Sequence, residues 1–212
     1  MKFFYNPIST YSQKALMALL EKGVSFEPQV VNLMSPEART AYEAVYPLGK
    51  IPLLVDDDGT LLPESSAIIE FLELRFAGQG TRLLPSDPRA AVEARRWDRF
   101  ADCMLNEPMG KIFFDGRRPA DQRDPAGVKD AFATVQKGMA YLDAHLAKNT
   151  WLAGEFSLAD CSAAPPLFYL KNVAPYESFK NVTAYASRLL ERPSYLKVMS
   201  EAMPILKAMM GG

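Results

Sequence analysis

Two short stretches of the sequence combine groups that could hold a peptide-like ligand. Ile51-Pro52 stands at the start of an expected strand, and proline restricts both its own φ and the residue before it. Such a turn would direct the Ile51 N–H and C=O out of the sheet, where another backbone could pair with them. Ser65 stands at the expected N-cap of a helix, whose free N–H groups attract a carboxylate, and the preceding Glu64 could accept from an ammonium. The chemistry suits an amino-acid end joined to a peptide backbone.

A third stretch, Pro7-Ile-Ser-Thr-Tyr-Ser-Gln-Lys14, carries hydroxyl groups where a helix should begin. A serine hydroxyl at a helix N-terminus can donate to a bound thiolate and so lower the pKa of that thiol. A thiol titrates near 8.5, so bringing it to neutrality requires roughly 1.4 to 2.7 kcal/mol. One charge-assisted hydrogen bond and a helix N-terminus could supply this. The alternative is that Ser9 only caps the helix and Ser12 is an ordinary first-turn residue.

The elements that must position these groups fill the first third of the chain. Short β-prone runs alternate with helical patterns, and Gly, Pro and Asp mark the turns between them. We expect strands at 2–5, 26–33, 52–56 and 60–62, with helices from Ser9 or Thr10 to Gly23, from 35 to 46 and from 65 to about 77. Pro28 places the second strand at an edge. This βαβ and ββα order predicts a thioredoxin-like domain with a mixed four-stranded sheet, an α/β fold.

The remainder of the chain is expected to be helical. Residues 79–88 are rich in Gly and Pro and are interpreted as a linker, so the predicted domains are 1–78 and an all-α domain at 89–212. Pro108 should kink the first long helix, and Ser157 with Asp160 forms a short capping box. Pro165-Pro166 should distort or break the helix that follows.

Composition excludes several classes of function. The 212 residues are 49% hydrophobic and carry a net charge of −1, which offers no basic field for nucleic acid. No apolar run is long enough to span a membrane, and the N-terminus lacks a signal-peptide core, so the cytoplasm is the expected location. Two cysteines and the single His145 are too few for a disulfide framework or a zinc site, so we expect no metal. A hydrolase triad would need His145, which lies in a polar late-helix context.

The order Gly-Lys-Ile-Pro, then Glu-Ser opening a helix, resembles the glutathione-binding half of the glutathione S-transferase family. The resemblance extends over nearly the whole chain. It implies that glutathione is the co-substrate, with no permanently bound cofactor. It also implies a homodimer and a role in detoxification. Serine-type members of the family activate the glutathione thiol with a hydroxyl of the first turn, which matches Ser9 here, with Ser12 as second choice.

Further residues follow from the same matching. Tyr5 is the third choice, because tyrosine-type members use a tyrosine at the end of the first strand; the alternative is a core aromatic. Ile51 and Pro52 would pair with the cysteinyl backbone of glutathione, Glu64 and Ser65 would hold its γ-glutamyl end, and Lys50 could reach the glycyl carboxylate.

The second substrate would be an apolar electrophile bound along the first long helix of the all-α domain, in the cleft between the domains. The methionines and aromatics around Pro108 would form its adaptable wall: Met104, Met109, Phe113 and Phe114. A stripe at this spacing could equally be core. A glutathione-dependent isomerase or dehalogenase would share the first substrate. A non-catalytic binding or scaffold module of the same fold is the alternative from another class.

Overall fold

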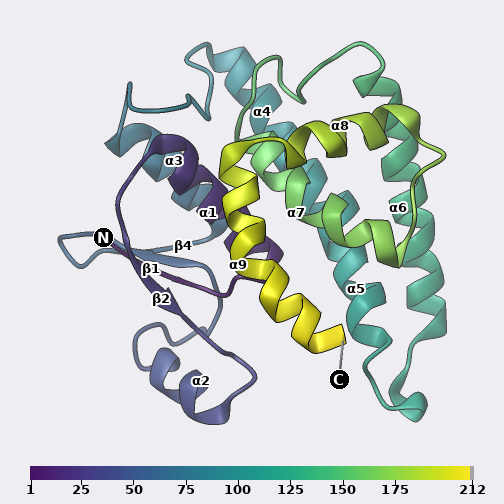
Figure 1. Cartoon of the computed structure of the whole chain (residues 1–212), viewed down its shortest axis with the longest axis horizontal. Helices are drawn as coiled ribbons and strands as arrows, with labels where there is room; N and C mark the ends of the chain where they lie inside the picture. The colour runs from purple at the N-terminus through teal and green to yellow at the C-terminus, as the bar shows by residue number, and fades with distance from the viewer. Residues whose placement is uncertain (211–212) are drawn as a thin grey trace. The chain divides into compact units, whose positions relative to one another are not determined.

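The computed structural model describes residues 1–210, which divide into two compact units. The first contains residues 1–83 together with the chain from Pro193 onward, and the second spans 84–192. The last helix, α9 (Pro193–Met210), therefore groups with the N-terminal unit, and it packs against α1 (Thr10–Lys22) (Figure 1). The domain limits expected from the sequence place this helix with the all-α part and stay a prediction.

The first unit is built on a mixed four-stranded sheet, which confirms the predicted fold class. Its strand order is β2-β1-β3-β4, with β1 parallel to β2 and antiparallel to β3. The strands are β1 (Lys2–Tyr5), β2 (Glu27–Val30), β3 (Leu53–Val55) and β4 (Leu61–Pro63). β2 lies at an edge, as Pro28 predicts, because proline cannot donate to a second neighbouring strand.

Alternating side chains cover the two faces of this sheet. Tyr42, from α2 (Pro36–Glu43), is buried in a core cluster with Leu53, against which Phe4 packs. Residues of opposite parity, such as Phe3, face the other side, where α1 contacts α3 (Ser65–Arg75) and α3 contacts β3 and β4 (Figure 1). The thioredoxin-like layers thus follow from a two-residue alternation.

The second unit is helical throughout its named elements. They are α4 (Pro88–Phe100), the π-helix η1 (Ala101–Asn106), α5 (Glu107–Asp115), the 3-10 turn η2 (Ala120–Gln122), α6 (Pro125–Leu146), α7 (Leu158–Val173) and α8 (Lys180–Leu190). The interruption expected near Pro108 takes the form of the π-helix just before it, because proline supplies no N–H for the regular ladder.

The predicted capping box of α7 is confirmed: the Ser157 N–H donates to Asp160 Oδ2 at 2.9 Å, and Ser157 Oγ accepts from the first turn. The possible break at Pro165-Pro166 was wrong, since α7 is continuous through both. Both prolines are buried, and packing on all sides holds the helical path. Within residues 1–210, no helix is long and apolar enough to cross a membrane.

Candidate active site

The strand register brings the three predicted site segments to one end of the sheet. Phe4 of β1 pairs with Leu53 of β3, and Leu53 pairs with Pro63 of β4. The end of β1, the start of β3 and the end of β4 therefore lie at the same end of the sheet. The turn before α1, the Ile-Pro pair before β3 and the Glu-Ser pair after β4 all adjoin this end.

Ser9 is the N-cap of α1 with extended backbone, φ −78° and ψ 123°. Its Oγ accepts from the Ser12 N–H at a long 3.4 Å, and among the described residues its own hydroxyl proton has no recorded acceptor. The side chain is half-buried. A hydroxyl that caps through its lone pair keeps its proton for a second partner, so capping and donation to an anion are compatible at Ser9.

Ser12 has a different environment. It is fully buried, and its Oγ accepts from the Asn6 N–H at 3.3 Å. Asn6 in turn donates to the Val31 carbonyl at 2.9 Å and accepts from Ile8 N–H at 3.1 Å. Ser12 therefore helps to hold the turn in shape from beneath, a geometry that favours Ser9 over Ser12 as the group presented to a ligand.

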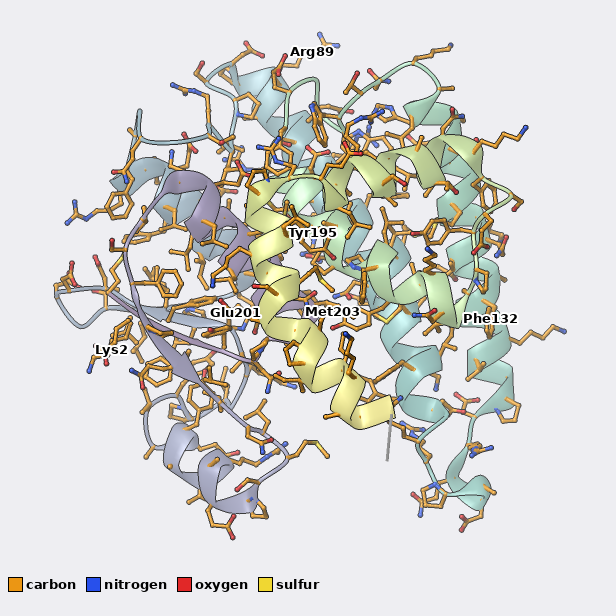
Figure 2. All side chains as sticks on the ribbon, in the orientation of Figure 1. Lys2, Arg89, Phe132, Tyr195, Glu201 and Met203 are labelled. Carbon is orange, nitrogen blue, oxygen red and sulfur yellow. The ribbon has the colours of Figure 1, made fainter. Side chains whose placement is uncertain are left out.

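Tyr5 is 4% exposed and stacks on Phe3 with ring centroids 5.0 Å apart. Its hydroxyl donates to Glu201 Oε2 at 2.8 Å, and Glu201 lies on α9 (Figure 2). Burial, and then the neighbouring carboxylate, raise the pKa of Tyr5 well above its ordinary value. The Tyr5 hydroxyl proton is thus already donated to the Glu201 carboxylate. Sequence reasoning missed Glu201 because no local signal connects residues 196 positions apart.

Glu64 is the one non-glycine residue with positive φ among the described residues, at φ 72° and ψ 116°. It is the N-cap of α3, which corrects the expectation that Ser65 is the cap; Ser65 is instead the first helical residue and is buried. The Glu64 side chain makes no capping hydrogen bond and is exposed. Strained backbone of this kind is costly and tends to occur at functional sites.

The Ile51-Pro52 peptide bond is cis, and both residues precede β3. Ile51 is half-buried, Pro52 is buried, and among the described residues Ile51 has no recorded backbone hydrogen bond. The Tyr42 hydroxyl donates to the Lys50 carbonyl at 2.6 Å, which fixes the approach to this pair. The Lys50 side chain is exposed. The pairing of the Ile51 backbone with an extended peptide stays a prediction.

A buried lysine near the first turn of α3 was not predicted. Lys14 on α1 is 1% exposed, and its Nζ donates to Ser66 Oγ at 2.8 Å. This hydrogen bond joins α1 to the first turn of α3, directly after Glu64. The sequence shows only a lysine at the start of an apolar helical run, and many surface lysines have the same sequence context.

In the second unit, the four residues predicted to line an apolar pocket differ in exposure. Met109 is 6% exposed, Met104 and Phe113 are half-buried, and Phe114 is 64% exposed. The rings of Phe113 and Phe114 meet edge to face at 5.3 Å. Their binding role stays a prediction.

This combination defines a class of protein: a thioredoxin-like unit with a hydroxyl at its first helix, an Ile-cis-Pro pair and a Glu-Ser helix start, followed by a helical unit. Residues 8–75 match the family model for the glutathione S-transferase N-terminal domain, and residues 121–196 match the C-terminal domain. The chain belongs to the glutathione S-transferase family, as the sequence predicted.

Relatives and solved structures agree with this assignment. Glutathione S-transferase F10 of Arabidopsis thaliana is 30% identical, covering 93% of this chain and 95% of its own. GstB of Escherichia coli (strain K12) is 32% identical, covering 90% and 93%. A glutathione S-transferase structure from Methylobacillus flagellatus with glutathione bound has a TM-score of 0.84 at 29% identity, covering 93% of this chain and 98% of that one. The F7 enzyme of Populus trichocarpa has a TM-score of 0.83 at 26% identity, covering 94% and 98%.

Proposed function

We propose that this protein binds glutathione at the end of the sheet described above and activates its thiol through the Ser9 hydroxyl. The single observation that carries the proposal is the state of Ser9: it caps α1 through its oxygen while its proton has no recorded acceptor among the described residues. The Ile51 backbone would pair with the cysteinyl unit of glutathione. Glu64 and the start of α3 would hold the γ-glutamyl ammonium and carboxylate, and Lys50 the glycyl carboxylate.

Catalysis would follow from thiolate stabilisation and proximity. The thiol proton leaves to solvent, and the Ser9 O–H donates to the sulfur anion. The thiolate then forms a C–S bond to an electrophilic carbon; either a leaving group departs with its electron pair, or a C=C π-bond opens and the adjacent carbon takes a proton. Moving the thiol pKa by about 1 to 2 units corresponds to roughly 1.4 to 2.7 kcal/mol, within reach of one charge-assisted hydrogen bond and a helix N-terminus.

The proposed second substrate is a largely apolar electrophile that contacts Met104, Met109, Phe113 and Phe114. We further propose a cytoplasmic homodimer with a role in detoxification, glutathione acting as co-substrate and not as a resident cofactor. Family membership supports the dimer, as do the exposed apolar side chains of Leu61 and Leu74 in the first unit, which are 41% and 82% exposed. Light scattering coupled to gel filtration tests the dimer.

The deciding experiment is an ultraviolet difference titration that measures bound glutathione thiolate against pH. Wild type should carry thiolate near neutrality, and Ser9→Ala should raise the apparent thiol pKa by about 1 to 2 units, with glutathione affinity changed by less than about three-fold. If wild type binds glutathione only as thiol, the proposed activation is wrong, and a carrier or scaffold module is the remaining interpretation. Unchanged glutathione affinity in both Glu64→Gly and Glu64→Gln would overturn the assignment of the γ-glutamyl end to Glu64.

A further inference from the structure

Helix α1 carries two buried lysines, and both of them reach α3. Lys14 and Lys22 are each 1% exposed. Lys14 Nζ donates to Ser66 Oγ at 2.8 Å, in the first turn of α3. Lys22 Nζ donates to Glu73 Oε2 at 3.2 Å, in the last turn of the same helix. Lysine is almost never fully buried unless it is paired, because removing an ammonium group from water is costly, so the position of each charge calls for an explanation.

Lys22 has a structural explanation. It forms an ion pair with Glu73, whose Oε2 also accepts from the Leu83 N–H at 2.8 Å. The lysine charge lies beside the last turn of α3, where the helix dipole favours a cation. Lys22 thus meets a carboxylate at the negative end of α3, and both interactions stabilise the folded chain.

Lys14 lies at the opposite end of α3. Ser66 is the second residue of this helix, and the helical ladder begins where the Ile68 N–H donates to the Glu64 carbonyl at 2.9 Å. The N–H groups of the turn before Ile68 therefore point out of the helix end and give it a positive potential. A buried ammonium group beside this end adds to that potential. Its placement is therefore unfavourable for α3 itself and favourable for an anion bound at the start of α3.

We propose that Lys14 is a positioning residue for the α-carboxylate of the γ-glutamyl unit of glutathione. Through Ser66 it holds the first turn of α3, and its charge strengthens the attraction of the helix start for that carboxylate. Lys14 itself does not touch glutathione, because it is buried and its ammonium group is directed at Ser66. Since Ser9 caps the same helix, the contact also joins the thiol-activating turn to the carboxylate-binding turn. This inference rests on the proposed glutathione-dependent function.

The test compares two ligands that differ only in this carboxylate: S-methylglutathione, and its analogue in which the γ-glutamyl α-carboxylate is an amide. The S-methyl group removes thiol ionisation from the measurement. Calorimetry should give wild type a preference of about 100-fold in Kd for the carboxylate ligand, as expected of charge-assisted hydrogen bonds at a helix start. Lys14→Met keeps a long side chain and removes its charge, and it should reduce this preference to about ten-fold.

Lys22→Met is the matched control, since it removes an equally buried charge from the same helix at the far end of α3. It should lower the melting temperature at least as much as Lys14→Met and leave the ligand preference as in wild type. A second pair of variants keeps Lys14 in place. Ser66→Ala deletes the acceptor and should reduce the preference by about three-fold, whereas Ser66→Thr keeps a hydroxyl and should retain it. This pair decides the question if Lys14→Met does not fold.

The outcomes separate failure of this inference from failure of the proposed function. If Lys14→Met weakens binding of both ligands equally, or if Lys22→Met loses as much of the preference, Lys14 is only structural and the inference falls alone. If Lys14→Met does not fold, equal preferences in wild type and Ser66→Ala overturn it. If wild type binds both ligands equally, the inference and the assignment of the carboxylate to α3 fall together, while the thiolate titration still tests activation by Ser9. If wild type binds neither ligand, the proposed function falls and this inference falls with it.

Discussion

The Tyr5 hydroxyl donates to Glu201 Oε2 at 2.8 Å, joining the first strand to the last helix. A second connection at the other end of α9 is made by Ser194, whose hydroxyl donates to Glu21 on α1. The strand and the helix on either side of the Ser9 turn are thus each tied to α9. The C-terminal helix thereby becomes part of the framework that holds the proposed activating hydroxyl.

Removing the tyrosine hydroxyl should cost stability and spare thiol activation. Tyr5→Phe deletes one hydrogen bond to a charged acceptor, so the free energy of unfolding should fall by about 1.5 to 3 kcal/mol in urea titrations. The pH profile of bound thiolate should stay as in wild type. Glu201→Ala should be destabilising too, and the double variant should cost less than the sum of the two. A large rise in the thiol pKa for Tyr5→Phe alone would make Tyr5 the activating group.

Ser12→Ala should behave as a structural substitution. The change leaves the N–H of the half-buried Asn6 without the Ser12 oxygen, a loss of about 0.5 to 1.5 kcal/mol in unfolding free energy. The thiolate titration should shift by less than about 0.3 unit, since the Ser12 oxygen is fully buried and is occupied by Asn6. A pKa shift equal to that of Ser9→Ala would reverse the ranking of the two serines.

The strained backbone at Glu64 should trade stability against binding. Glu64→Gly relieves a positive φ that costs side-chain-bearing residues about 1 to 3 kcal/mol, so the protein should become more stable to urea. Glutathione affinity, measured by calorimetry, should nevertheless fall about ten-fold with loss of a charge-assisted hydrogen bond. Glu64→Gln is the control that keeps the backbone strain and removes only the charge. Unchanged affinity in both variants would contradict the assignment of Glu64.

Asp160 should make a contribution to the free energy of unfolding that decreases as pH rises. Complete burial raises the pKa of its carboxyl to about 6, only partly offset by the Tyr185 hydroxyl at 2.6 Å and by the Leu152 and Ser157 N–H groups. The folded state therefore binds the proton more tightly than the unfolded state. This contribution to stability is fully present below about pH 4 and is lost as pH rises through about 6, by on the order of 2 to 3 kcal/mol.

The measurement is the difference in unfolding free energy between wild type and Asp160→Asn from pH 4 to 7. Because the amide side chain of this variant cannot titrate, the stability of wild type relative to the variant should decline across this range. The variant should be less stable overall, since an amide has one acceptor oxygen where the carboxylate has two: if that oxygen keeps Leu152 and Tyr185, an NH2 group faces the Ser157 N–H. A constant difference across the range would show that Asp160 does not titrate there.

The local signals in the sequence determined the elements and the order of the candidate site. Pro28 fixed an edge strand because proline lacks an N–H, and the Ser157-to-Asp160 spacing specified a helix start because both partners lie within one turn. The Ser9 turn was likewise readable, because capping is short-range chemistry, whereas the start of α3 was predicted to within one residue but with Ser65 in place of Glu64 as its cap. These features depend on neighbours a few residues away.

Tertiary structure decided which of these groups are available for chemistry. Burial of Ser12 and the partner of Tyr5 depend on chain segments distant in sequence, so the ranking of the three hydroxyls could not be settled from spacing. The positive φ of Glu64 is imposed where β4 turns into α3, and no local preference of glutamate predicts it. The lack of a hydrogen-bond partner for Asn106 Oδ1 among the described residues appears only once the helices are packed, since it depends on which groups the fold brings near.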